Sequence, residues 1–199
     1  MAVEGTLSRP VSARPERPEP AIPHAVFGMV LAIICEMLFF SGLVAAFIVG
    51  ESANPGAWPP PGQPRFPVEV TGVNTLALLA SGVLALLANR AHGAGRPSFV
   101  GLLTAAAVLG AVFLGVQGVE WQGLIREGLT LSYSTHASFF YLLVGMHAAH
   151  ALVALGGLVW AVAQARKGAL GKGGLVAASL FWGFVVLVWP VLYVLVYLL

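Results

Sequence analysis

The sequence contains a single cysteine, Cys35, and no aspartate, and charged residues make up only 9% of its 199 positions. A lone cysteine can form neither an intrachain disulfide nor a thiolate cluster nor a dinuclear copper centre. The chain also lacks a phosphate-binding loop, a glycine-rich nucleotide fingerprint and a nucleophile with a neighbouring base. These absences indicate that the chain performs no hydrolytic or redox chemistry with its own residues, so no catalytic residue is predicted.

The scarcity of charge accompanies long apolar stretches. Hydrophobic residues make up 58% of the chain and its mean hydropathy is +0.88, whereas soluble domains carry about 25% charged residues. Five successive stretches are long enough, at about 1.5 Å per residue, to cross a hydrocarbon core of about 30 Å as helices. They are residues 25–49, 70–88, 97–119, 128–165 and 173–199. The sequence therefore predicts an all-α, polytopic membrane protein with five transmembrane helices.

The positive charges are divided unevenly between the two sides of such a bundle. Residues 1–23 interleave prolines with arginines and glutamates, which predicts a disordered tail, and residues 24–199 form the transmembrane domain. Only Arg65 and Arg126, of ten Lys and Arg residues, lie on the side opposite to this tail. The positive-inside rule then predicts a cytoplasmic N-terminus and an external C-terminus. No basic patch with interleaved aromatic residues indicates binding to nucleic acid.

One carboxylate interrupts the first apolar stretch. Glu36 is the only ionisable residue between positions 25 and 49, and it lies about halfway along the stretch. An acid near the middle of a membrane costs at least about 2.5 kcal/mol on insertion scales, so it is kept where a cavity, a bundle interior or a partner accepts it. Two interpretations stand equally: a protonated acid that donates a hydrogen bond between helices, or a group with a functional role.

Further polar residues inside the predicted helices form a candidate buried network: Gln117, Glu120, His136, His147 and His150. The rise per residue places Glu36 and His150 about 15 to 16 Å from the cytoplasmic edge and His147 about 21 Å from it. Glu120 and His136 lie about 30 Å or more from that edge. We therefore hypothesise a mid-membrane level that holds Glu36, His147 and His150, and an outer level that holds Gln117, Glu120 and His136.

The three histidines of the fourth stretch share one helix face, because they fall within about 60° of one another at 100° per residue. His147 and His150 could chelate a metal together with a carboxylate from another helix. A haem would need axial histidines on facing helices, and the other two histidines, His24 and His92, lie at membrane edges. Hydrogen bonds across helices are the expected role, so no metal ligand is predicted.

Five sequence elements, in order, resemble subunit III of the haem-copper oxidases. They are Phe27-Gly28-Met29 with residues 35–43, the loop Trp58-Pro59-Pro60-Pro61-Gly62, Asn74-Thr75 with residues 79–82, the Gln-x-x-Glu-aromatic element of Gln117, Glu120 and Trp121, and Phe139-Phe140 with residues 145–150. Each element alone is weak evidence for the family, but five elements in the family order are strong evidence. The resemblance runs from about Phe27 to the C-terminus, and the five-helix length is similar to the short bacterial form of that family.

The resemblance implies a non-catalytic core subunit of an aerobic respiratory terminal oxidase, which works in electron transport and proton translocation. Such a subunit would lie in a bacterial cytoplasmic membrane. It would bind catalytic subunit I, subunit II and small subunits, and it would hold phospholipid in a cleft. It would stabilise the catalytic subunit and support proton uptake or oxygen access. The chain itself would bind no cofactor, since haem and copper would belong to the partner subunits. The resemblance also places Glu36 beside the lipid cleft as a proton-linked group.

The last helix departs from the family pattern. The family usually has an aromatic-Trp-His-Phe-Val-Asp-x-Val-Trp run, whereas this chain has Gly183 and Val186 in place of the histidine and the aspartate. Pro190 follows and predicts a kink. Three other functions stay open. One is an accessory subunit of a nitric oxide reductase, and another is a haem or metal electron carrier that uses the three histidines of the fourth stretch. The third is a small proton-coupled transporter, for which internal repeats and broken helices are expected, and no repeat is found.

Overall fold

A computed structural model of the chain describes residues 22–56 and 58–198. The described residues form helices and loops, without a strand: α1 (His24–Ser52), α2 (Val68–Gly93), α3 (Phe99–Arg126), α4 (Thr135–Arg166), α5 (Lys172–Tyr193) and a terminal π-helical turn, η1 (Val194–Leu198). Five helices, the last counted with η1, are long and apolar enough to cross a membrane. The predicted all-α fold with five transmembrane helices is confirmed. Most of the predicted tail, residues 1–21, lies outside the described residues.

The helix boundaries differ from the apolar stretches at several ends. The second and third helices continue through charged residues to Gly93 and Arg126, because a helix can extend beyond the hydrocarbon core into the polar interface. The fourth helix begins at Thr135 and not at position 128, since Gly128 has φ 90° and ends the preceding turn. Ser134 then caps α4, its Oγ accepting a hydrogen bond of 3.0 Å from the Ala137 amide.

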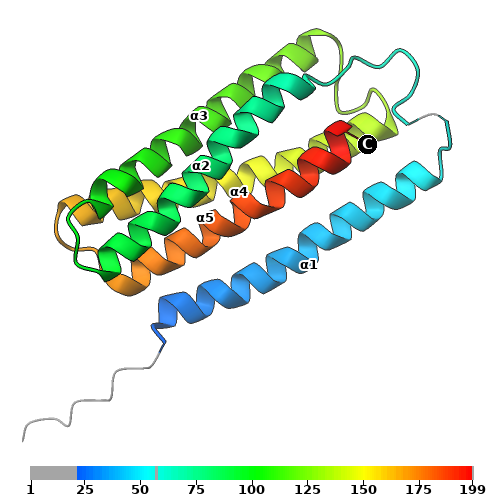
Figure 1. Ribbon diagram of the computed structural model, residues 1–199. Coiled ribbons are helices and arrows are strands. Elements are labelled where there is room, and N and C mark those ends of the chain that lie inside the picture. Colours follow the sequence, from blue (N-terminus) through cyan, green and yellow to red (C-terminus); the bar gives the residue numbers. More distant parts are fainter. Residues whose placement is uncertain (1–21, 57, 199) are drawn as a thin grey trace, which may run out of the picture.

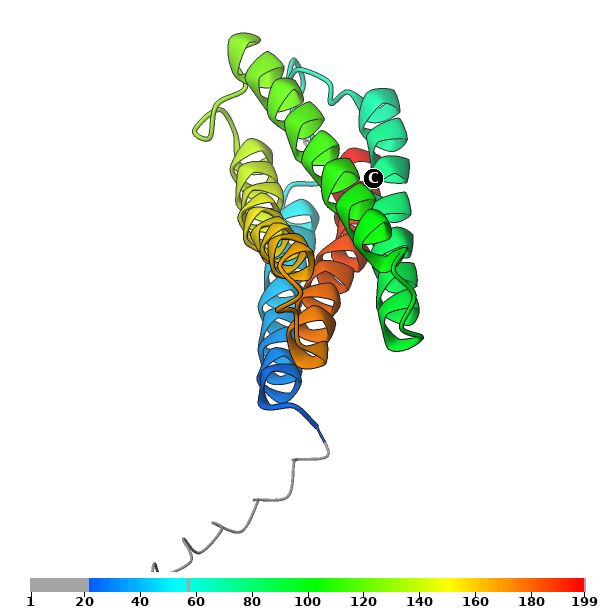
Figure 2. The same cartoon turned by 90° about the vertical axis from the view of Figure 1, so that its left-hand side faces the viewer.

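Helices α2 to α5 form a bundle, and α1 runs along one side of it (Figure 1). In the bundle α2 packs against α3 and α5, and α4 packs against α3 and α5. The first helix contacts α4 and α5 and buries only two of its side chains fully, Phe40 and Phe47. Figure 2, turned by 90°, shows α1 beside α4 and α5 and away from α3. Groups on α1 can therefore meet groups on α4 and α5.

Close packing inside the bundle depends on small residues and on hydrogen bonds between helices. A Cβ on Gly110 of α3 would lie 2.6 Å from the ring of Trp182 on α5, so only glycine leaves room for this ring against α3. The Trp182 indole donates to Ser81 Oγ (3.0 Å), and Ser81 donates in turn to the Ala106 carbonyl (2.6 Å). These bonds join α5, α2 and α3 and satisfy polar groups that water cannot reach.

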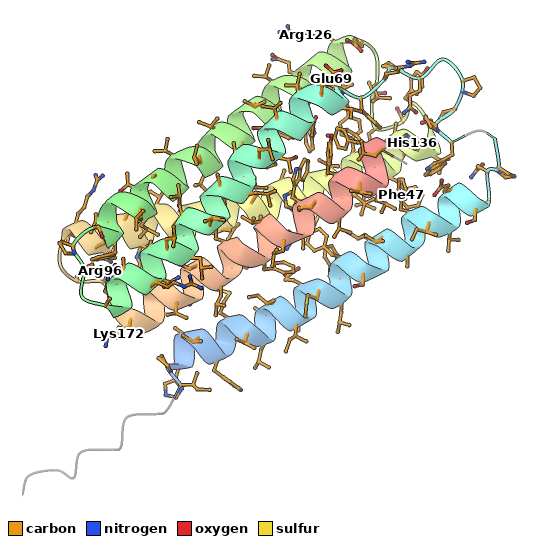
Figure 3. All side chains as sticks on the ribbon, viewed as in Figure 1. Phe47, Glu69, Arg96, Arg126, His136 and Lys172 are labelled. Carbon is orange, nitrogen blue, oxygen red and sulfur yellow. The ribbon has the colours of Figure 1, made fainter. Side chains whose placement is uncertain are left out.

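The two ends of the bundle carry different loops. Arg96 and Lys172 lie at one end, and Glu69 and Arg126 lie at the other (Figure 3). The end with Arg96 and Lys172 is the one that the charge distribution predicts to be cytoplasmic. Pro190 lies within α5, and the chain widens into the π-helical turn η1 four residues later, at Val194.

Candidate functional site

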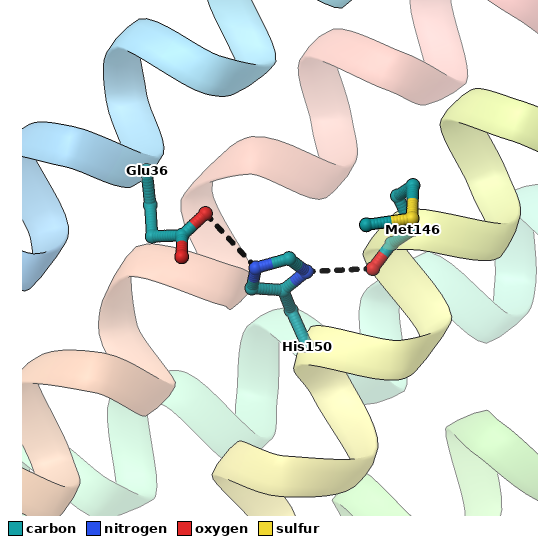
Figure 4. Close-up of polar contacts among 3 residues, drawn as sticks. All are labelled: Glu36, Met146 and His150. Carbon is teal, nitrogen blue, oxygen red and sulfur yellow. Dashed lines mark hydrogen bonds and ion pairs between the residues drawn. The ribbon is translucent and has the colours of Figure 1, made fainter.

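Glu36 of α1 and His150 of α4 form a hydrogen-bonded pair between helices. Glu36 Oε2 lies 2.9 Å from His150 Nε2, and His150 Nδ1 donates to the Met146 carbonyl oxygen at 2.7 Å (Figure 4). Phe40 stands edge-on to the imidazole, with ring centroids 5.2 Å apart. The pair lies where α1 meets α4, and its side chains are 31% (Glu36) and 15% (His150) exposed on the isolated chain.

The hydrogen bonds of His150 fix how many protons the pair holds. A carbonyl oxygen can only accept, so Nδ1 carries a hydrogen. The contact between Nε2 and Oε2 then needs one more proton, which belongs either to a neutral carboxylic acid or to an imidazolium. In both cases the acid and the imidazole together have no net charge. This neutrality explains how Glu36 is accommodated among apolar residues near the middle of a membrane helix.

His147 is placed differently from His150, although both lie on α4. Its side chain is 1% exposed, and neither ring nitrogen has a hydrogen-bond partner among residues 22–56 and 58–198. The imidazole lies against the indole of Trp189 on α5, with centroids 5.0 Å apart and planes at 33°. The mid-membrane level thus contains Glu36 paired with His150, while His147 faces α5. In the same part of the chain no group of three or more His, Cys, Asp or Glu side chains is placed to hold a metal ion.

A chain of hydrogen bonds leads from Trp189 toward the other end of the bundle. The Trp189 indole donates to Thr75 Oγ1 (2.8 Å), and Thr75 donates to the Thr71 carbonyl (2.8 Å). The Thr71 hydroxyl donates to Glu120 Oε2 (2.8 Å), which also accepts from Gln117 Nε2 (2.9 Å). Gln117 Nε2 also lies 3.1 Å from the Tyr197 hydroxyl of η1. The chain of hydrogen bonds therefore connects α5, α2, α3 and η1.

Two members of this network do not appear among the residues that the sequence singles out. Thr71 lies four residues before Thr75 on the same helix face, a spacing that could have indicated a shared polar stripe. Tyr197, which lies 3.1 Å from Gln117 Nε2, is part of the π-helical turn η1, and no sequence pattern signals that turn.

His136 does not join Gln117 and Glu120 in the hydrogen-bonded network, although it lies at the same end. Its Nδ1 accepts a hydrogen bond of 2.8 Å from Gln63 Nε2, and Gln63 Oε1 accepts from Ser134 Oγ at 2.8 Å. The ring stacks on Phe66 and stands edge-on to Trp58, with centroids 5.6 and 4.9 Å apart. His136 therefore fastens the loop between α1 and α2 to the start of α4. The outer level thus consists of two separate hydrogen-bonded groups.

An apolar groove of about 1210 Å³ lies between α1, α2 and α5. Along α1 its lining extends from Ile33 to Ile48, about 22 Å at 1.5 Å per residue. Gly183 and Val186, the two positions that depart from the family pattern, both line it, and a Cβ on Gly183 would meet nothing within 4 Å. Among residues 22–56 and 58–198, no charged side chain lines the groove. Its polar residues are Ser41, Asn89 and Ser179, and the last two lie toward the end of the bundle with Arg96 and Lys172.

Comparisons with known proteins agree on one family. Residues 21–199 match the family model described as cytochrome c oxidase subunit III. Cytochrome c oxidase subunit 3 of Synechocystis sp. is 35% identical over 183 residues, which cover 87% of this chain and 75% of that protein. The proteins of the same name from Arabidopsis thaliana and Sus scrofa are 34% and 33% identical over 180 residues, which cover 86% of this chain and 67% and 68% of those proteins.

Proposed function

The chain belongs to the cytochrome c oxidase subunit III family, and from that membership we propose that it is a non-catalytic core subunit of an aerobic respiratory terminal oxidase. As a family member it is a multi-pass subunit of a haem-copper oxidase complex. In the proposal it binds catalytic subunit I and subunit II, with small subunits, in a bacterial cytoplasmic membrane. It stabilises the catalytic subunit, holds phospholipid, and supports proton uptake or oxygen access. Haem and copper belong to its partners.

The apolar groove is the observation that carries the lipid-binding part of this proposal. A groove of about 1210 Å³ that opens between three membrane helices must be filled in a bilayer, and its uncharged lining suits hydrocarbon. Its length of about 22 Å exceeds one leaflet of a core of about 30 Å. Asn89 and Ser179 line one end, where they can hydrogen-bond a lipid head group. The proposed occupant is therefore a phospholipid with its head toward the predicted cytoplasmic side.

The partly exposed Glu36 and His150 pair supports a contact with a partner subunit. A carboxyl group that is 31% exposed at mid-membrane depth would face lipid tails if the chain stood alone. A transmembrane partner that covers the junction of α1 and α4 removes this exposure. In the proposal this partner is the catalytic subunit, and the proton held between Glu36 and His150 lies at that interface.

The relatives named for cytochrome c oxidase favour this function over the alternatives. A proton-coupled transporter is expected to have broken helices at its substrate site, and α1 to α4 run without interruption. The accessory subunit of a nitric oxide reductase has no observation in its favour.

A substitution that fills the groove tests the proposed lipid site. In Gly183→Leu the new side chain enters the groove, and in Gly118→Leu a matched side chain is added on the exposed face of α3, where a Cβ also meets nothing within 4 Å. The purified complexes are compared by mass spectrometry of retained phospholipid. We expect Gly183→Leu to lose tightly bound lipid and Gly118→Leu to keep it. Equal lipid content in both variants would contradict the proposed site.

A further inference from the structure

Two buried side-chain oxygens near Glu120 have no hydrogen-bond donor among the described residues. Glu120 Oε2 accepts from Thr71 and from Gln117, but Glu120 Oε1 has no partner among the described residues. Gln117 Oε1 also lacks one, and the Gln117 side chain is 4% exposed. An ionised carboxylate and an amide oxygen can only accept hydrogen bonds. Two neighbouring buried acceptors without a donor are unfavourable, because the surrounding helices close them off from solvent.

The amide of Gln117 cannot resolve this shortage by turning over. In the observed orientation its nitrogen donates to Glu120 Oε2 (2.9 Å) and lies 3.1 Å from the Tyr197 hydroxyl, so both amide hydrogens have a partner. The flipped amide would place its oxygen against Glu120 Oε2, again acceptor against acceptor. Either orientation lacks one hydrogen between the acid and the amide.

We propose that Glu120 holds a proton on Oε1 and donates it to Gln117 Oε1, so that this chain has a second proton-binding site, separate from Glu36 and His150. The acid and the amide then form a closed pair: Gln117 Nε2 donates to Glu120 Oε2, and the Glu120 hydroxyl donates to Gln117 Oε1. One proton supplies a partner to both orphaned oxygens. It also leaves this buried part of the bundle without a carboxylate charge.

The groups around Glu120 fit a neutral acid. Thr71 of α2 and Gln117 of α3 donate neutral hydrogen bonds, and Tyr197 of η1 is a neutral phenol. The structure places no Lys, Arg or His side chain within 4.0 Å of the Glu120 carboxyl in the described part of the chain. A carboxylate here would have no countercharge. The proposal concerns only these residues and does not depend on the lipid site or on the function of the complex.

Cryo-electron microscopy of the intact complex, purified through this chain, tests the proposal directly. The expected result is a distance of about 2.5 to 3.0 Å between Glu120 Oε1 and Gln117 Oε1 with no density between them, because two such oxygens approach this closely only when they share a hydrogen. A resolved water or ion between the two oxygens, or a separation beyond hydrogen-bond distance, would overturn it.

Substitutions give an independent test that does not need high resolution. In Glu120→Gln the new amide nitrogen can replace the acid hydroxyl as donor to Gln117 Oε1, so the inactivation temperature of the complex is expected to match the wild type. Glu120→Ala removes every bond of the carboxyl and is expected to lower that temperature by several degrees. Glu127→Gln, at an exposed glutamate just after α3, is the matched control. The proposal is overturned if Glu120→Gln lowers the temperature as much as Glu120→Ala while the control is silent.

Discussion

Glu36 Oε2 lies 2.9 Å from His150 Nε2, and this contact joins the first membrane helix to the fourth. Since His150 Nδ1 donates to the Met146 carbonyl, one shared proton completes the contact with Glu36. A carboxyl group that is costly when isolated in a membrane is thereby part of a neutral pair. Stability should therefore depend on the hydrogen-bonded pair as a whole and not on the charge of the acid.

Substitutions of the two partners should differ in their effect on stability. In Glu36→Gln the amide nitrogen can still donate to His150 Nε2, so assembly should be intact and stability should change by less than about 1 kcal/mol. In His150→Leu the acid is left without a partner and the cost should be about 1 to 3 kcal/mol. Thermal inactivation of the purified complex measures both, and turnover stability should change modestly in Glu36→Gln. Loss of the whole complex in Glu36→Gln would show that the acid itself is needed for assembly.

Two glycines of α3 should respond oppositely to the same substitution. A Cβ on Gly110 would lie 2.6 Å from the Trp182 ring, so Gly110→Ala should destabilise the chain by about 1 to 3 kcal/mol through overpacking. Gly118 is exposed, with nothing within 4 Å of its Cβ position. Gly118→Ala should be neutral or stabilise by up to about 1 kcal/mol, because alanine is the better helix former. Equal tolerance of both substitutions, in thermal unfolding, would contradict the close contact between the Trp182 ring and Gly110 of α3.

The hydroxyl of Thr75 should contribute more to the stability of the chain than the hydroxyl of Thr104. Thr75→Val removes the acceptor of the buried Trp189 indole hydrogen, so it should cost about 1 to 3 kcal/mol. In the described part of the chain the Thr104 hydroxyl bonds only to the Val100 carbonyl of its own helix turn. Thr104→Val should therefore change stability by less than about 0.5 kcal/mol. Thermal unfolding of the two variants gives the comparison, and similar losses would speak against the bond between α5 and α2.

The sequence predicts the helices well and the contacts between them less well. The lengths of the apolar stretches were sufficient to predict five membrane helices. The rise per residue places Glu36 and His150 at similar depth, and the structure pairs them. The same count groups His147 with them, but α4 contacts both α1 and α5, so His150 meets Glu36 of α1 while His147 lies against Trp189 of α5. His136 is held by Gln63, a loop residue whose position follows from tertiary packing that depth along a helix does not describe.

The orientation of the chain in the membrane is predicted from its charge distribution alone, and thiol labelling can test it. In a Cys35→Ser background, Thr130→Cys places a thiol in the exposed loop between α3 and α4, and Ala169→Cys places one in the exposed loop between α4 and α5. A membrane-impermeant thiol reagent added to intact spheroplasts should label Thr130→Cys and leave Ala169→Cys unlabelled until the membrane is opened. The reverse labelling pattern would mean that the N-terminus is outside.

Purification through an affinity tag on this chain, in mild detergent, tests the central claim most directly. If the chain is a non-catalytic subunit of a haem-copper oxidase, the purified material should contain a catalytic subunit, show haem absorption and reduce oxygen. The chain separated from its partners should show no haem absorption. Recovery of the chain without any haem-copper partner, or stoichiometric haem on the separated chain, would contradict this account.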